Sequence, residues 1–337
     1  MENTTKNTQP RLTIKSPLVS FNRRFPNESA CKQKFLEFRR RVGIKCPVCG
    51  CEAHYYISTI EKFQCKNCNH RQGLRANTVM HHSRLPFRYW FLAFQLVTST
   101  KNSFSAAEIQ RQLGHQYYRP IWQMMMKISD VLGISNDTIT LNTNVELDEC
   151  FISTRIRKDE LTTNWKGKPY KHKKPYKLTK TKCVVACESI PVNQTEEQSR
   201  KYHLKHACGR LKMFVVPDFK MATIHSTVVN EIEHDAIIRS DATLSHKTLP
   251  DVFRHYTQSV IAPEDISKTL PYVHIAIGNL KAMLRNVHHS VSPEYLQMYL
   301  NIFVWKFNNR TTPKLLNTLM DALVISKPRL ALNHYDS

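Results

Sequence analysis

Two Cys-x2-Cys pairs lie in the first quarter of the 337-residue chain and are separated by fifteen residues. The four cysteines are Cys46, Cys49, Cys65 and Cys68. This spacing is typical of a zinc site, because each pair presents two thiolates to one tetrahedral ion. The intervening stretch is long enough to return as a hairpin, and apolar residues at 55–57 and 63 fit its two strands. Four thiolates fill the coordination sphere, so we predict a structural zinc ribbon over residues 31–80.

The alternative to a zinc site is a set of disulfides or of free thiols, which depends on the compartment. The first residues contain no apolar leader, and no apolar run approaches the ~20 residues of a membrane-spanning helix. We therefore expect a soluble cytoplasmic protein with reduced thiols and no membrane contact. Cys51 and His54 are candidate substitute ligands with poorer spacing, and the later cysteines are expected to be buried as small apolar side chains.

The charge of the chain favours a polyanionic partner. The sequence holds 49 Lys and Arg against 27 Asp and Glu, a formal net charge of +22, and the commonest soluble polyanion is nucleic acid. Residues 1–130 carry 21 basic and 7 acidic side chains, and residues 166–182 carry eight lysines and no acid. We predict that 166–182 forms a loop whose Lys171, Lys173 and Lys174 bind DNA phosphates; a solvated loop is the alternative.

A helix-turn-helix is predicted over residues 81–140. Residues 85–100 are expected to form a buried helix, Ser105 and Glu108 have the spacing of a capping box, and Gly114 ends the helix that follows. A second helix is expected from Pro120. The pattern also suits any three-helix bundle, but the neighbouring zinc site and charge favour DNA binding. The side chains expected at the DNA groove are Gln116, Tyr118, Arg119, Gln123 and Lys127.

The second half of the sequence alternates strands and helices. Strands are predicted over 144–152, 181–187, 211–216 and 236–241, and helices over 222–233, 272–287 and 293–308. Asp148 lies on the first strand and Asp241 ends the fourth, which predicts a mixed-sheet α/β domain with two carboxylates on neighbouring strands. Such a pair suits Mg²⁺ and phosphodiester chemistry. The alternative is two acids at strand ends without a catalytic role.

Several ordered motifs resemble the Merlin-related, ISXO-type insertion-sequence transposases of bacteria. The strongest are His-x-x-x-x-Asn-Leu-Lys at 274–281, a His-Gly-Val-Ser-like turn within 288–297, and a Phe-Asn-x-Arg ending at 301–310. Residues 35–49 and 83–90 also resemble the N-terminal half of that family. The likeness extends from about residue 20 to 320.

The resemblance implies an RNase H-like domain over 141–312, between the helix-turn-helix and a C-terminal tail at 313–337, with an N-terminal tail at 1–30. It implies strand cleavage and transfer of double-stranded DNA by two Mg²⁺ or Mn²⁺ ions, with Asp148 and Asp241 as the first two catalytic residues. The motif points to Asn279 and Lys281 for the rest of the site. Helical geometry, however, places His274 and Lys281 on one face and Asn279 well round from both, so His274 and Asn279 are both candidates.

The resemblance also implies a homo-oligomer on DNA, at the terminal repeats and the target, and hence association with the nucleoid. Three other functions stay open from the sequence. These are a DNA-binding regulator, a structure-specific nuclease, and a decayed or domesticated transposase.

Overall fold

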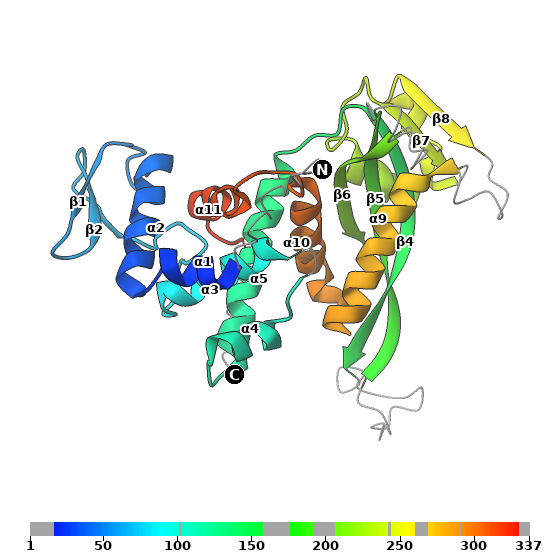
Figure 1. Cartoon of the computed structure of the whole chain (residues 1–337). Helices are drawn as coiled ribbons and strands as arrows, with labels where there is room; N and C mark the ends of the chain where they lie inside the picture. Colours follow the sequence, from blue (N-terminus) through cyan, green and yellow to red (C-terminus); the bar gives the residue numbers. More distant parts are fainter. Residues whose placement is uncertain are drawn as a thin grey trace, which may run out of the picture.

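The structure is a computed structural model that describes residues 17–100, 103–157, 176–191, 206–241, 244–259, 269–289 and 291–329. Figure 1 shows two lobes, with the N-terminal strands and helices on one side and a five-stranded sheet on the other. The predicted DNA-contacting lysines, Lys171, Lys173 and Lys174, lie outside the described residues. The prediction of a loop over 166–182 is wrong for residues 176–182, which belong to the strand Tyr176–Pro191 because they continue the antiparallel pairing with Asn144–Arg157.

The N-terminal lobe begins with α1 (Pro17–Arg24) and α2 (Glu28–Val42), followed by an antiparallel three-stranded sheet. Its strands are β1 (His54–Ile57), β2 (Lys62–Cys65) and β3 (Arg71–Gly73). Tyr56 pairs with Phe63 across β1 and β2, so the predicted hairpin between the two cysteine pairs is confirmed. The third strand was not predicted from the sequence.

Three helices follow: α3 (Phe87–Ser99), α4 (Ala106–Leu113) and α5 (Tyr118–Asp137). The Ser105 side chain accepts a hydrogen bond from the Glu108 N–H at 3.1 Å, which confirms the predicted start of α4. The Glu108 carboxylate instead contacts Arg111 and Gln112, so only half of the capping box forms. Gly114 ends α4 with φ of 62°, a left-handed conformation that favours glycine.

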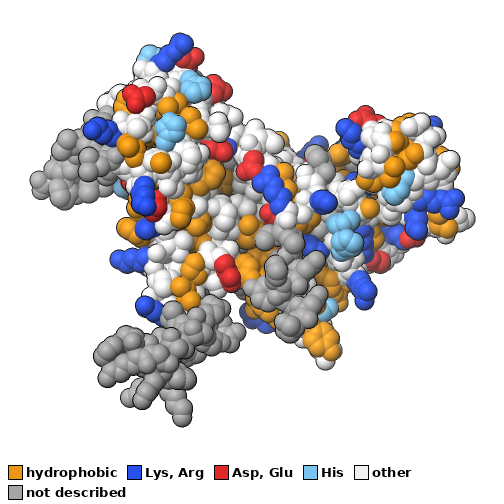
Figure 2. Space-filling view, turned by 180° about the vertical axis from the view of Figure 1, so that it is seen from behind, with side chains coloured by type: hydrophobic (Ala, Val, Ile, Leu, Met, Phe, Trp, Pro, Cys, Tyr) orange, Lys and Arg blue, Asp and Glu red, His pale blue; other side chains and the backbone are white. Residues whose placement is uncertain are grey.

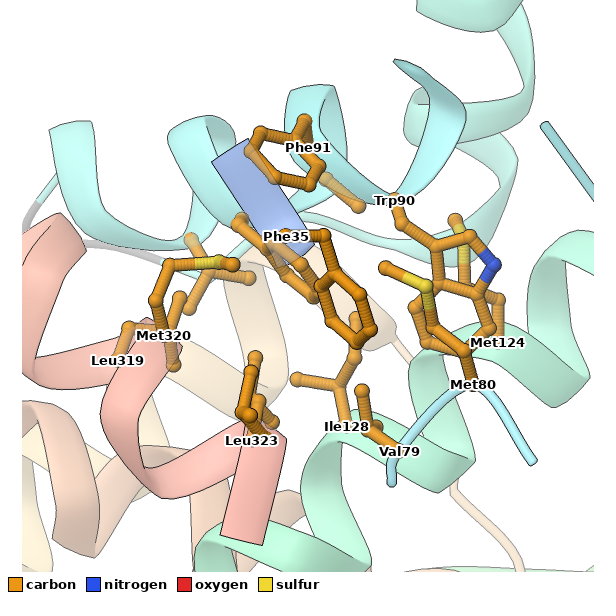
Figure 3. Packing of buried hydrophobic residues seen from close by; sticks show 14 of the residues in the cluster. Phe35, Val79, Met80, Trp90, Phe91, Met124, Ile128, Leu319, Met320 and Leu323 are labelled. Atoms are coloured by element: carbon orange, nitrogen blue, oxygen red, sulfur yellow. The ribbon is translucent and has the colours of Figure 1, made fainter. Parts of the chain in front are cut away.

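The core of this lobe includes residues from both ends of the chain. Figure 3 shows Phe35 of α2, Trp90 and Phe91 of α3, and Ile128 of α5 packed together with Leu323 of α11. Helix α11 (Leu315–Ile325) therefore returns to the N-terminal lobe, where the Val79 N–H donates to the Leu323 carbonyl at 3.0 Å. The segments expected as tails at 1–30 and 313–337 thus contain α1, the start of α2 and α11. Long-range apolar packing orders them.

The second lobe has a five-stranded sheet in the order β6-β5-β4-β7-β8. Its strands are β4 (Asn144–Arg157), β5 (Tyr176–Pro191), β6 (His206–Val216), β7 (Ile237–Asp241) and β8 (His255–Ser259). Strands β4, β5 and β6 are antiparallel neighbours, whereas β7 and β8 run parallel to β4. The predicted mixed α/β fold is confirmed, and it is consistent with an RNase H-like domain.

Helices cover both faces of this sheet. On one face, α7 (Met221–Val228) contributes Ile224 and Val228 to a core with Leu147 of β4. On the other face lie α9 (Pro271–Met283) and α10 (Leu296–Asn308), whose apolar side chains pack on Cys150 and Ile152 of β4. Figure 1 shows α9 lying along the sheet beside β4. One turn of π-helix (Leu284–His288) continues α9.

Helix α10 joins the two lobes. Its Leu300 and Val304 pack toward the sheet, while Ile302 and Trp305 belong to the core of the N-terminal lobe. Gly133 of α5 lies so close to α10 that an added Cβ would meet the Asn301 amide nitrogen at 2.4 Å. The two lobes are therefore held together by close helix packing rather than by a linker alone. None of the described helices is both long and apolar enough to cross a membrane.

Candidate functional site

Asp148 and Asp241 lie on neighbouring parallel strands. Leu147 of β4 pairs with Ser240 of β7, so the next residue of each strand is an aspartate. The side chains are partly accessible, at 15% for Asp148 and 29% for Asp241. Burial raises the pKa of Asp148, and the charges of Asp241 and Glu149 raise it further, while His274 opposes the change. Two carboxylates that disfavour each other's charge form a donor set that fits a hard divalent cation.

His274 of α9 reaches the same carboxylate. Its Nδ1 lies 3.6 Å from Asp148 Oδ2, and its Nε2 is buried without a hydrogen-bond partner among the described residues. The start of α9 is fixed by Glu146, a buried residue of β4 that accepts hydrogen bonds from the N–H groups of Tyr272 at 2.8 Å and Val273 at 2.9 Å. A carboxylate at a helix N-terminus is favourable, so Glu146 places His274 beside Asp148.

The two other candidates on α9 lie differently. Lys281 is two turns after His274 on the same side of the helix, and it lines a hollow of about 290 Å³ with Ile152 and Ser153 of β4. Asn279 is exposed, and its side chain makes no hydrogen bond with the part of the chain that the structure describes. The structure therefore brings His274 and Lys281 to β4, and it does not bring Asn279 to either aspartate.

A third group around Asp241 was missed from the sequence. His246, fully buried in the short 3₁₀ helix η2 (Leu244–His246), lies 3.2 Å from Asp241 Oδ1 through Nδ1 and 3.2 Å from Glu149 Oε1 through Nε2. Ser245 donates a hydrogen bond to the same Glu149 oxygen at 2.7 Å. Burial lowers the pKa of His246, but the two carboxylates outweigh it and raise the pKa to about 9. The imidazole therefore lies between Asp241 and Glu149, and the ligand atoms of the three side chains, within 4.8 Å of one another, are close enough to hold a metal ion.

The four predicted cysteines come together in the ribbon. Their sulfur atoms lie within 4.8 Å of one another, with 3.5 Å between Cys46 and Cys68 and 3.6 Å between Cys49 and Cys65. A tetrahedral site with zinc–sulfur distances of about 2.3 Å has sulfur–sulfur edges of about 3.8 Å, so the set fits zinc. Cys51 is outside the set, and its sulfur contacts the backbone of Ala53 instead.

The two cysteine turns repeat one backbone pattern. The N–H of Gly50 donates to the Cys46 carbonyl at 3.0 Å, and the N–H of Asn69 donates to the Cys65 carbonyl at 3.1 Å. Both residues have positive φ, 72° for Gly50 and 58° for Asn69, as expected where glycine and asparagine follow a tight turn. The local sequence thus folds each pair into a loop that directs two thiols to one point.

Comparison with known proteins gives the family. Residues 140–308, half of the chain, match the ISXO2-like transposase domain, and residues 26–71 match the transposase zinc-ribbon domain. The chain belongs to the ISXO2-like transposase family. It is also 23% identical over 136 residues to an uncharacterized protein in transposable element ISH50 of Halobacterium salinarum. That match covers 40% of this chain and 45% of the relative.

One motif of this transposase-family chain has a structural role. Asn308 accepts a hydrogen bond from the Leu211 N–H at 2.8 Å and donates to the Leu211 carbonyl at 3.0 Å, as a neighbouring strand would. Arg310 donates to the carbonyls of Cys208 and Gly209. Strand β6 is an edge of the sheet, so the Phe-Asn-x-Arg ending satisfies its free backbone groups. These residues support the fold rather than the chemistry.

The predicted DNA-groove residues of this transposase-family chain lie around the start of α5. Gln116, Tyr118 and Arg119 are exposed, with Tyr118 at 48%. Gln123 and Lys127 line a hollow instead, and the Lys127 ammonium donates to the His81 carbonyl at 2.7 Å. The neighbouring Met124, Met125 and Met126 are buried, as predicted for core packing.

Proposed function

We propose that the chain is an insertion-sequence transposase that binds the terminal DNA of its element and cuts and joins DNA strands at Asp148 and Asp241. The observation that supports this most is the pair of aspartates on neighbouring parallel strands, inside the segment that matches a transposase domain. DNA is the partner that the family and the net charge of +22 favour.

Mg²⁺ or Mn²⁺, as two ions, would be held by Asp148 and Asp241 and would supply activation of the attacking oxygen and stabilisation of the leaving oxygen. Glu149 and His246 orient the Asp241 carboxylate, because His246 lies 3.2 Å from each of the two acids. Such supporting groups fix the direction of a ligand. Lys281 contacts a DNA phosphate near β4, in the hollow that it lines with Ile152 and Ser153.

For the third polar position, we favour His274 over Asn279. His274 lies 3.6 Å from Asp148, whereas Asn279 is on another face of α9. The zinc ribbon and the helix-turn-helix, over residues 31–80 and 81–140, bind the element ends, with the lysines of 166–182 adding phosphate contacts. The active form is a homo-oligomer on DNA, with structural zinc in each chain.

The proposal is tested with duplex DNA that carries the repeats flanking the gene. We expect wild-type protein with Mg²⁺ to cut at the repeat end and to join pre-cleaved ends to target DNA, and Asp148→Asn or Asp241→Asn to lose both reactions. Cleavage without joining would make the chain a nuclease. Binding without cleavage under any divalent ion would make it a DNA-binding regulator or a decayed copy.

Two matched variants on α9 distinguish the two candidates for the third polar position. We expect His274→Ala to lower the rate of cleavage well below that of Asn279→Ala, because only His274 contacts an aspartate. Single-turnover cleavage at saturating Mg²⁺ measures both, and thermal unfolding checks the fold. The reverse order would assign the position to Asn279 and reject the geometric argument.

A further inference from the structure

A hollow of about 410 Å³ separates the loop after the ribbon from the start of α5. Four of its lining residues are basic, and none of the described lining residues is acidic. The basic residues are His82, Arg84, His115 and Lys127. Figure 2 shows Lys and Arg side chains on the visible face of both lobes, so the basic character of the hollow rests on its own lining residues.

The loop that forms one wall of the hollow is held in place by side chains that donate hydrogen bonds to its carbonyl oxygens. Arg75 donates to the Ser83 carbonyl at 2.6 Å, and Lys127 donates to the His81 carbonyl at 2.7 Å. The Trp90 indole N–H donates to the Ser83 hydroxyl at 3.3 Å. His82 between these anchors has φ of 57°, an uncommon conformation for a residue with a side chain. These hydrogen bonds fix the loop, and they occupy the carbonyl oxygens of His81 and Ser83 and the Ser83 hydroxyl.

The side chains of the hollow that are available to a ligand are mostly hydrogen-bond donors. Arg84 is exposed and forms no ion pair with the described residues. Lys127 is half-buried, and burial lowers its pKa, so an anion beside it would offset the cost of burying its charge. Gln123 lies one turn before Lys127 on the same side of α5 and faces the same hollow. A fixed, donor-rich hollow without acids suits an anion with several acceptor oxygens.

We propose that this hollow binds one backbone phosphate of the DNA, with Arg84 and Lys127 as its main contacts. It rests on the proposed function, because the phosphate belongs to the element-end duplex. The hollow lies beside the exposed start of α5, at Gln116 and Arg119, so a phosphate bound there sets the position of α5 on the duplex. Gln123 and Lys127 then position the protein rather than read bases.

The test compares Arg84→Gln with Arg254→Gln, using fluorescence anisotropy of a labelled duplex that carries the terminal repeat. Arg254 is the control because it is an exposed arginine of the other lobe, with 76% of its side chain accessible, and its charge is already paired with Asp235 at 3.2 Å. We expect Arg84→Gln to reduce the slope of log affinity against log salt by about 0.9, which is roughly an eightfold loss at 0.1 M salt. Arg254→Gln should leave the slope nearly unchanged.

Neutral methylphosphonates, placed one at a time in the duplex, identify the phosphate. Wild-type protein should lose affinity at each phosphate that it contacts, and Arg84→Gln should show no further loss at one of these positions, the phosphate of the hollow. Equal slopes for the two variants, or additive losses at every position, would reject the phosphate hollow while leaving DNA binding intact. If wild-type protein binds no duplex at all, the proposed function fails and the hollow's role fails with it.

Discussion

The cysteine site of the ribbon and the aspartate site of the sheet are built in opposite ways. The four cysteines come from 23 consecutive residues, and their thiols fill a coordination sphere without room for a substrate. Asp148 and Asp241 are separated by 92 residues of sequence, meet only when β4 pairs with β7, and stay partly accessible. The first arrangement suits a structural ion, and the second suits the ions that the proposed reaction would bring to DNA.

The two sites also differ in what surrounds the ligands. In the ribbon, backbone turns at Gly50 and Asn69 direct the thiols. In the sheet, a buried side chain, His246, holds one aspartate, and Glu146 fixes the helix that carries His274. A change in the ribbon should therefore remove structure, whereas a change around the aspartates should remove chemistry with little loss of structure.

The largest expected effect is the loss of a ribbon ligand. Cys49→Ser should release the zinc and unfold residues 44–73, because structural zinc sites in small peptides contribute about 10–16 kcal/mol of apparent binding free energy. The matched control is Cys51→Ser, whose sulfur lies outside the four-cysteine set. Zinc content, determined by mass spectrometry, and DNA affinity are measured for both variants. If Cys49→Ser retained one zinc per chain, the cysteine assignment would be wrong.

The ribbon and the start of α4 were predictable because their signals are local. Cysteine spacing, the Ser105 cap and Gly114 each act within a few residues of the chain, so their sequence patterns are complete. The aspartate pair was predictable as strand positions, since alternation places Asp148 opposite Leu147. The resemblance of the whole sequence to transposases predicted the family, and the comparisons confirm it.

The supporting residues were not predictable in the same way. His246 lies in a 3₁₀ helix of only three residues, and its partner Glu149 is 97 residues earlier in the chain. Glu146 reads as one more polar residue of a strand until α9 is seen to begin at it. Helix α11 has no local signal that it packs on α2 and α3. These contacts depend on tertiary packing, which local periodicity does not encode.

Glu149→Gln should have a smaller effect than Cys49→Ser. It removes the charge that holds His246 against Asp241, and loss of such a supporting group costs about 10–100-fold in metal affinity or activity. The control is Glu233→Gln, an exposed residue of the same domain. The rate of cleavage and the Mn²⁺ concentration for half-maximal rate are measured together. A variant that matches its control in both quantities would show that Asp241 needs no such support.

The smallest effect concerns the contact between the two lobes. Gly133→Ala places a Cβ 2.4 Å from the Asn301 side chain and should destabilise the chain by about 1–3 kcal/mol. Gly278→Ala is the matched control, since nothing lies within 4 Å of its added Cβ, and it should stabilise α9 by up to about 1 kcal/mol. Denaturant unfolding measures both. Equal changes for the two helical glycines would contradict the close packing of α5 on α10.

The decisive measurement counts Mn²⁺ ions bound to the full-length chain by electron paramagnetic resonance, for wild-type protein, Asp148→Asn and Asp241→Asn. We expect the wild-type chain to bind Mn²⁺ at the aspartates, both variants to lose that binding, and all three proteins to retain one zinc each. Mn²⁺ binding that is unchanged in both variants would show that Asp148 and Asp241 do not hold the catalytic ions.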